Sequence, residues 1–301
     1  FRDFRKYFFS EISIKRIHQF ISRSDAFNRD KILQENIITY GIKEKSDHNS
    51  TVMISSSNGR SDIKDSEYIT VNRREILNHK DDFVLALPSN AQELSVFSLV
   101  KQWTNNLEKM DLKVSTGPVV PFRATEFLAN KAEKGTVPLF WIQHIKPMKT
   151  IFPLPDFRKP QWFKHNERSE KLLIRNQNMI LMRRFSPKED FRRITVSPFF
   201  GQLFHGEFVG LENHLNYIYK KNGNFSCSEI TGLTAFLSSK IFDIYFRALN
   251  GNTQISATEL RSAPLPENRV LIEIGRLVIK SKAQSHLEID TIVNDIIEFE
   301  I

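Results

Sequence analysis

Residues 232–266 read GLTAFLSSKIFDIYFRALNGNTQISATELRSAPLP, and this stretch decides the fold of the C-terminal part of the chain. Apolar side chains recur at steps of three and four between residues 230 and 248, which predicts a single helix with a wide buried face. Asn250-Gly251 is a helix stop, because glycine takes the left-handed conformation without a Cβ penalty. The sequence therefore predicts a core helix that ends in a short polar loop.

A second helix follows the loop at once. Ser256 and Glu259 have the spacing of a capping box, and Pro264 and Pro266 end the helix that the box begins. The polar loop is thus held at both ends, and it presents amide and hydroxyl groups in set directions, as hydrogen-bond reading of base edges requires. An ordinary connection between two helices has the same pattern, so the loop alone does not identify a function.

The same stretch resembles the end of the target recognition domain that is fused to gamma-type adenine-N6 DNA methyltransferases of bacterial restriction-modification systems. In that family a GNTQ-x-x-A-T-x-L-R segment followed by prolines is typical. Four further blocks of this chain match in the same order: VSTGPVVPFR (114–123), PLFWIQHIKPM (138–148), LMRRFSPKEDFRRI (181–194) and GLENHLNYIY (210–219). The resemblance covers residues 1–266 and is weakest in residues 44–77.

The composition is that of a folded chain with a basic surface. The 301 residues carry 43 Lys plus Arg against 35 Asp plus Glu, and the +8 charge with a pI near 9.4 favours a polyanionic partner or a solvated basic face. A single cysteine, Cys227, excludes an internal disulfide and a cysteine-rich zinc site. No apolar run approaches the length of a membrane span, so we expect a cytoplasmic protein without a membrane partner.

The order of predicted elements indicates a mixed α/β fold in three parts. Residues 1–43 resemble the edge of a Rossmann-like methyltransferase sheet that closes with an antiparallel hairpin. Residues 44–110 are a connector with strands and a helix from about residue 91 to 110. Residues 111–301 are expected to form an α+β target recognition domain with two closing helices, around residues 269–281 and 287–299. The chain starts at Phe1 and not at methionine, which suggests a piece of a longer protein.

The resemblance implies a reaction centre that these residues do not contain. An adenine methyltransferase needs a glycine-rich turn for S-adenosylmethionine and a DPPY- or NPPY-type segment for the adenine amine. The chain has no glycine-rich strand-to-helix turn, and no Asn or Asp precedes two prolines. We therefore expect no catalytic residue and no bound cofactor here, with S-adenosylmethionine and the catalytic region supplied upstream in the parent protein.

One aromatic residue is a candidate for holding a flipped base. Enzymes that act on a base extrude it from the duplex and hold it by stacking. In the family an aromatic residue before the sheet-edge hairpin does this, and the matching residue is Phe27, within the polar segment SRSDAFNRD. An aromatic that folds back onto the sheet would have the same sequence context.

The candidates for contact with double-stranded DNA are polar side chains inside the matched blocks. Arg pairs with guanine O6 and N7, and Asn or Gln pairs with adenine N6 and N7. Arg192 and Arg193 are predicted to clamp phosphates, whereas Asn213 and His214 have turn stabilisation as an open alternative. The predicted base readers are Thr116, Arg123, His144, Lys146, Arg183, Arg184, Asn213, His214, Asn216, Asn252, Thr253 and Gln254.

Other functions fit the residues less well. The histidines are scattered without metal-ligand spacing and Cys227 has no neighbouring histidine, which argues against a metal hydrolase or a cysteine nucleophile. A non-catalytic specificity subunit of a type I restriction system carries similar recognition domains, and residues 1–43 argue against it. A basic protein-interaction scaffold is the remaining alternative, and the salt dependence of DNA binding separates it from a phosphate-binding protein.

Overall fold

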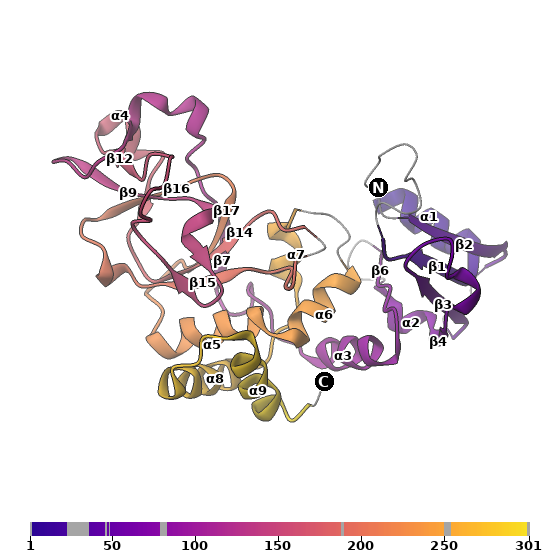
Figure 1. The fold of residues 1–301 in the computed structure, drawn as a ribbon. Helices are drawn as coiled ribbons and strands as arrows, with labels where there is room; N and C mark the ends of the chain where they lie inside the picture. Colours follow the sequence, from indigo (N-terminus) through magenta and orange to yellow (C-terminus); the bar gives the residue numbers. More distant parts are fainter. Residues whose placement is uncertain are drawn as a thin grey trace. The chain divides into compact units, whose positions relative to one another are not determined.

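The computed structural model describes residues 2–22, 36–45, 47, 49–78, 83–187, 190–249 and 254–299 (Figure 1). The fold is mixed α/β, as the sequence predicts. The chain divides into two compact units: unit 1 comprises residues 1–101 and 244–251, and unit 2 comprises residues 102–243 and 252–301. Among the described residues, none of the helices combines the length and apolar character that a membrane crossing requires.

Unit 1 is built on a four-stranded sheet in the order β2-β1-β3-β4. β1 and β2 are antiparallel, as the expected hairpin requires, and β1 and β3 are parallel. Ile14 and Ile17 of β1 and Val52 and Ile54 of β3 are buried in a shared core. The elements are α1 (Arg2–Glu11), β1 (Ile12–Phe20), β2 (Asn36–Lys43), β3 (Thr51–Ser57), β4 (Tyr68–Asn72), α2 (Arg73–Ile76), β5 (Leu77–Asn78), β6 (Val84–Leu85) and α3 (Ala91–Gln102).

The helix predicted to reach residue 110 is shorter. It ends at Gln102, after which Asn105 forms a backbone bridge with Leu265 and its carbonyl accepts the N–H of that leucine at 2.9 Å. A helical backbone would have used this carbonyl internally, so the bridge and the longer helix exclude each other.

Unit 2 contains two main sheets. The five-stranded sheet has the order β13-β16-β9-β12-β8, and the four-stranded sheet has the order β15-β14-β17-β7. Their strands are β7 (Leu112–Thr116), β8 (Leu128–Ala129), β9 (Thr136–Phe140), β12 (Trp162–Lys164), β13 (Ile174–Arg175), β14 (Met179–Arg183), β15 (Val196–Phe199), β16 (Phe208–Leu211) and β17 (Leu215–Lys220). The short strands β10 (Ile145–Lys146) and β11 (Lys149–Thr150) form a hairpin, and α4 (Glu167–Glu170) follows β12.

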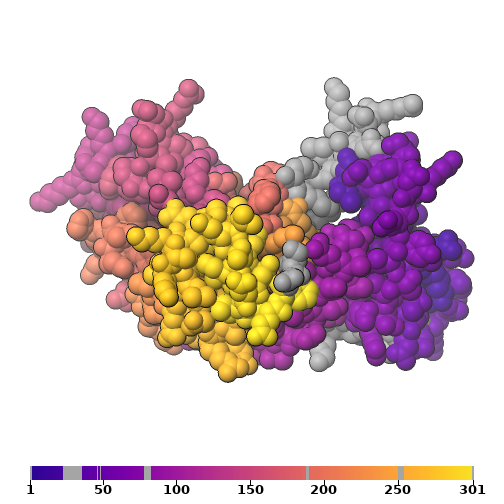
Figure 2. Space-filling view, turned by 60° about the horizontal axis from the view of Figure 1, so that its bottom comes forward, coloured from indigo at the N-terminus to yellow at the C-terminus, as the bar shows by residue number. Residues whose placement is uncertain are grey.

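α5 and α7 pack beside the four-stranded sheet, and α8 and α9 pack on α5 (Figure 1). Two glycines bring α5 and α8 into backbone contact: a Cβ on Gly232 would lie 1.7 Å from the Leu271 carbonyl oxygen, and one on Gly275 would lie 2.0 Å from that of Ser228. α8 and α9 close the chain as predicted, and both contribute to the face drawn in yellow in Figure 2. The helices are α5 (Cys227–Ser238), α6 (Lys240–Leu249), α7 (Ala257–Ser262), α8 (Asn268–Ser281) and α9 (His286–Ile297).

The single helix predicted over residues 230–248 is two helices that meet at Ser239. Ser239 has extended backbone angles, φ −71° and ψ 158°. Its hydroxyl accepts the Phe242 N–H at 3.3 Å, and Asp290 Oδ1 accepts the Lys240 N–H at 2.7 Å. These acceptors satisfy N–H groups that the first turn of a helix leaves without intrahelical partners. They stabilise the start of a second helix at a point where the apolar periodicity predicted one continuous helix.

Candidate nucleic-acid interface

Three strand ends meet at one end of the four-stranded sheet. β17 runs antiparallel to both β14 and β7, with Arg183 opposite Leu215 and Asn216 opposite Thr116. The last residues of β14 and β7 therefore lie beside the first residues of β17. This arrangement brings together parts of three sequence blocks that are up to 100 residues apart. We call this end of the sheet the block edge.

The segment after the predicted polar loop is fastened to the block edge. The Ile255 N–H donates to the Arg184 carbonyl at 2.8 Å, and Gln254 forms a backbone bridge with Phe185. Asn216 completes the attachment, since its Nδ2 donates to the Ile255 carbonyl at 3.2 Å. Ser256 is the N-cap residue of α7, as predicted, but its hydroxyl accepts the Thr258 N–H at 3.2 Å and not the Glu259 N–H that the predicted capping box uses. Gln254 is exposed, whereas the predicted readers Asn252 and Thr253 lie outside the described residues.

The turn after β7 packs against the start of β17. Gly117 donates to the Leu215 carbonyl at 2.8 Å, and Val119 accepts the Asn213 N–H at 2.9 Å. A Cβ on Gly117 would lie 2.3 Å from the Glu212 carbonyl oxygen, so only glycine allows this close approach. The Thr116-Gly117-Pro118 break that the sequence predicts is therefore the place where the first block meets the fourth.

The remaining block reaches the same edge through Arg183. Its Nε and Nη2 both donate to the Ile145 carbonyl, at 3.1 and 2.7 Å, and its side chain is half-buried. Arg183 thus holds the start of β10, and the guanidinium groups available for a ligand must come from elsewhere. All five sequence blocks contribute residues to one continuous region of unit 2.

His144 is a buried structural residue. Its side chain has no exposed surface, Nδ1 accepts the Trp141 N–H at 2.8 Å, and Nε2 lies 2.9 Å from Gln161 Oε1. Because Nδ1 accepts, the neutral ring carries its proton on Nε2 and donates it to Gln161. Burial lowers the pKa of His144 below its ordinary value of 6.5. These contacts do not match the base-reading role predicted for this residue.

Asn216 is also buried, and both ends of its amide are engaged. The Thr116 hydroxyl donates to Asn216 Oδ1 at 2.9 Å, opposite the bond to Ile255 described above. Asn216 therefore positions its neighbours and does not itself face a ligand. Thr116 remains exposed beside it.

Several predicted readers do have accessible side chains at or near the block edge. Arg184 is half-buried, donates from Nη1 to the Asn213 carbonyl at 3.2 Å and lies over the Phe185 ring. Arg123 is exposed and lies 5.3 Å from the centroid of the Phe122 ring. The set that the structure leaves accessible comprises Thr116, Arg123, Lys146, Arg184, Asn213, His214 and Gln254.

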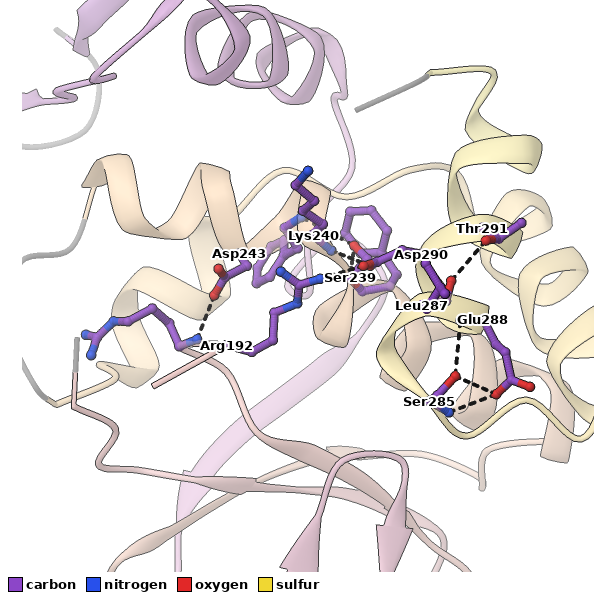
Figure 3. A network of polar contacts seen from close by, with 12 residues as sticks. Arg192, Ser239, Lys240, Asp243, Ser285, Leu287, Glu288, Asp290 and Thr291 are labelled. Carbon is purple, nitrogen blue, oxygen red and sulfur yellow. Dashed lines mark hydrogen bonds and ion pairs between the residues drawn. The ribbon is translucent and has the colours of Figure 1, made fainter. Parts of the chain in front are cut away.

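The positions of Arg192 and Arg193 do not match a phosphate clamp. Arg192 Nη2 pairs with Asp290 Oδ2 at 2.5 Å, and both side chains are largely buried (Figure 3). Arg193 has no exposed surface, its N–H donates to Asp243 Oδ1 at 2.6 Å, and its Nη1 donates to the Ser186 carbonyl. The two arginines tie the segment after β14 to α6 and α9, because burial of a guanidinium is tolerated only when acceptors surround it.

Two features of the site carried no sequence signal. Glu212 is buried at 2% exposure and accepts from His214, whereas glutamates in a turn are ordinarily solvated. Phe185 keeps 40% of its surface exposed between Arg184 and His214. The predicted stacking residue Phe27 lies outside the described residues. Within the described part of the chain, no group of three His, Cys, Asp or Glu side chains is arranged to hold a metal ion.

Comparison with known proteins gives relatives of one kind. The chain is 32% identical over 294 residues to the type II methyltransferase M.PstI of Providencia stuartii, a match that covers 98% of this chain and 58% of the relative. It is 33% identical over 301 residues to the type II methyltransferase M.BsuBI of Bacillus subtilis, covering 99% of this chain and 59% of the relative. No known protein-family profile matches the chain.

Solved structures with some likeness come from restriction-modification systems. The type IIG restriction endonuclease BpuSI aligns with 98% of this chain and 45% of its own length, at 10% identity and a TM-score of 0.39. The HsdS subunit from Thermoanaerobacter tengcongensis aligns with 69% of this chain and 49% of its own, at 10% identity and a TM-score of 0.27. The sequence matches to M.PstI and M.BsuBI are the stronger result: this chain is homologous to type II methyltransferases and spans about three fifths of their length.

Proposed function

We propose that the chain is the DNA-reading part of a site-specific, adenine-N6 DNA methyltransferase of a restriction-modification system. In this proposal unit 2 is the target recognition domain and unit 1 adjoins the catalytic region of the parent protein. The parent uses S-adenosylmethionine and acts on duplex DNA in the bacterial cytoplasm. Homology to two type II methyltransferases supports the class of enzyme.

The convergence of five sequence blocks at the block edge is the observation that carries the proposal. Backbone and side-chain hydrogen bonds fasten the strand ends and the segment at Gln254 into one rigid edge. The accessible groups there are an alcohol, two amides, an imidazole and cationic side chains. These are the chemical groups that read base edges and contact phosphates in duplex DNA.

The turn after β3 does not fit the glycine-rich turn that S-adenosylmethionine needs. Gly59 follows the parallel strand β3 and is the described glycine nearest to such a position. The N–H groups of Asn58 and Gly59 both donate to the Asp62 carboxylate, at 2.7 and 2.8 Å, and Ser57 Oγ donates to the Gly59 carbonyl. The N–H groups of Asn58 and Gly59 are bound to a carboxylate, so neither is directed at a cofactor.

Selection from a random DNA library tests the proposal directly. A 30-base-pair duplex pool with a randomised centre is incubated with the 301-residue chain at about 0.15 M salt, and bound DNA is sequenced over several rounds. We expect enrichment of one short sequence, and affinity for it that decreases steeply as salt rises. Binding with no enriched sequence, or no binding at low salt, would overturn the proposal.

A further inference from the structure

A buried carboxylate and a half-exposed histidine form a pair in the turn between β16 and β17. Glu212 Oε1 contacts His214 Nδ1, and Glu212 Oε2 accepts the His214 N–H at 3.2 Å. The Glu212 side chain is 2% exposed, whereas that of His214 is 50% exposed. One carboxylate therefore holds both the backbone and the ring of His214.

The buried carboxylate of Glu212 needs a partner that offers donors or positive charge. An ionised carboxylate out of water is stable only with a nearby positive charge or several donors. Among the described residues, His214 is the side chain that contacts the Glu212 carboxylate. With Nδ1–H donating to the carboxylate, a protonated ring has Nε2–H as its second donor, and no described residue bonds to that nitrogen.

The groups around the ring fix its orientation. The Phe185 ring lies 5.3 Å from the His214 ring, at 60° between the planes. The arginines nearby keep their positive charge and bond to neutral acceptors: Arg184 donates to the Asn213 carbonyl and Arg183 donates to the Ile145 carbonyl. Gln254, which bridges Phe185, is uncharged. Glu212 is the carboxylate in contact with the imidazole.

We propose that Glu212 is a positioning residue that keeps His214 as an imidazolium, whose Nε2–H donates to an acceptor on duplex DNA. The acceptor is a phosphate oxygen or the O6/N7 edge of guanine, and the inference rests on the proposed function. A neutral histidine with Nδ1–H bound to Glu212 would present a bare Nε2 and could not donate there. In this proposal the Glu212 carboxylate sets the charge of His214 and makes its Nε2 a donor.

A double-mutant cycle tests the pair on the duplex enriched from the random pool. We expect His214→Gln and Glu212→Gln each to weaken binding about tenfold, since both remove one charge-assisted hydrogen bond to DNA. We expect the double variant to bind no worse than His214→Gln, because Glu212 acts through His214. Additive losses, or His214→Gln binding like the wild type, would overturn the inference.

Two measurements separate the possible acceptors. A phosphate contact predicts that His214→Gln reduces the slope of log K against log salt by about one, and that a neutral methylphosphonate in place of one phosphate abolishes the effect of the variant. A guanine contact predicts an unchanged slope, and loss of the effect when one guanine is replaced by 7-deazaguanine, which lacks N7, or by 2-aminopurine, which lacks O6. If none of these replacements abolishes the effect, His214 does not donate to DNA and the inference is wrong.

Spectroscopy gives a test that does not depend on the folding of variants. In protein labelled with 15N-histidine at neutral pH, we expect one imidazole with protons on both nitrogens, whose Nε2 signal shifts when the enriched duplex is added. His214→Gln assigns that signal by its loss. An unprotonated Nε2 would contradict the inference. His205→Gln is the matched control, because His205 is exposed on the loop after β15, at the opposite end of the sheet from Arg183, and should bind DNA like the wild type.

If the random pool yields no enriched sequence, the proposed function fails before these tests apply. If a sequence is enriched and the cycle shows no coupling, the proposed function stands and the role of the pair fails.

Discussion

Asp290 of α9 joins two segments that precede it in the chain: one carboxylate oxygen pairs with the Arg192 guanidinium and the other accepts the Lys240 N–H. Figure 3 shows how α9 and the start of α6 meet at this carboxylate. The contact fastens the segment after β14 to α6 and α9. It is therefore a structural contact, and its loss should appear in stability.

Asp290→Ala should lower the free energy of unfolding by about 3 kcal/mol, because it leaves a buried guanidinium and a helix N–H without their acceptor. Chemical denaturation measures the change. Glu273→Ala is the control: its pair with Arg276 is exposed on α8 and should contribute less than about 1 kcal/mol. Equal effects of the two substitutions would contradict the assignment of a buried, stabilising pair.

Gly275→Ala should destabilise unit 2 by at least about 2 kcal/mol, because the new methyl group meets the Ser228 carbonyl of α5 and the two helices must separate. Thermal unfolding followed by circular dichroism measures the change. Ser281→Ala, at the exposed end of the same helix, should change stability by less than about 0.5 kcal/mol. A wild-type melting temperature for the Gly275 variant would show that the helices do not cross this closely.

Asn216→Ala should weaken binding to the enriched duplex at least about tenfold, because Thr116 and the Ile255 carbonyl both lose their shared partner at the block edge. Fluorescence anisotropy with labelled duplex measures affinity. Asn178→Ala is the matched control, since Asn178 is also buried and bonded on both sides, to the Gly201 N–H and the Phe225 carbonyl, at the far end of β14. Asn178→Ala should lower stability and leave the affinity of the folded protein unchanged. If Asn178→Ala and Asn216→Ala weaken binding equally, the block edge has no special role in binding.

Stability should fall on acidification because of His144. Burial lowers its pKa in the folded chain, so the unfolded chain binds the proton more tightly. Its contribution is complete above the ordinary value of 6.5 and is lost as the pH falls from there through the folded pKa. We expect His144→Asn to flatten the dependence of the melting temperature on pH between about 7 and about 5. His205→Gln should keep the wild-type dependence of melting temperature on pH. If His144→Asn also keeps it, His144 does not cause the loss of stability at low pH.

Phosphate contact is expected from exposed cations, and Arg123→Gln tests one of them. The substitution should weaken binding to all duplexes, whatever their sequence. It should also reduce the slope of log K against log salt by about one. Arg192→Gln should leave the salt slope unchanged in the folded protein, since its guanidinium is bound to Asp290. Binding isotherms at several salt concentrations distinguish these outcomes, and a reduced slope for Arg192→Gln alone would restore the original prediction for that residue.

Local signals in the sequence predicted local structure well. The Thr116-Gly117-Pro118 break, the Ser256 cap and the two closing helices follow from backbone geometry and periodicity, and each is present. The break at Ser239 could not be predicted in the same way, because the acceptor for the Lys240 N–H comes from Asp290, 50 residues later. The apolar period continues through Ser239 even though the helix does not.

The site was predictable as a set of sequence blocks and not as a set of roles. The resemblance selected the segments that meet at the block edge, but arginine is equally suited to a phosphate and to a buried carboxylate. Arg192 pairs with Asp290, and Arg183 donates to the Ile145 carbonyl; both partners are distant in sequence. Glu212 shows the converse: its turn position predicts a solvated carboxylate, and packing of the Gly117 turn against Leu211 and Glu212 accompanies its burial.

Under the proposed function, the close approach at Gly117 has a consequence for redirecting the protein to a new target. The edge is assembled from segments between Leu112 and Ile255 whose backbones bond to one another, so a foreign loop grafted at one position would inherit neighbours shaped for another. Chimeras should succeed when this whole span is exchanged as a cassette and fail when single loops are transplanted.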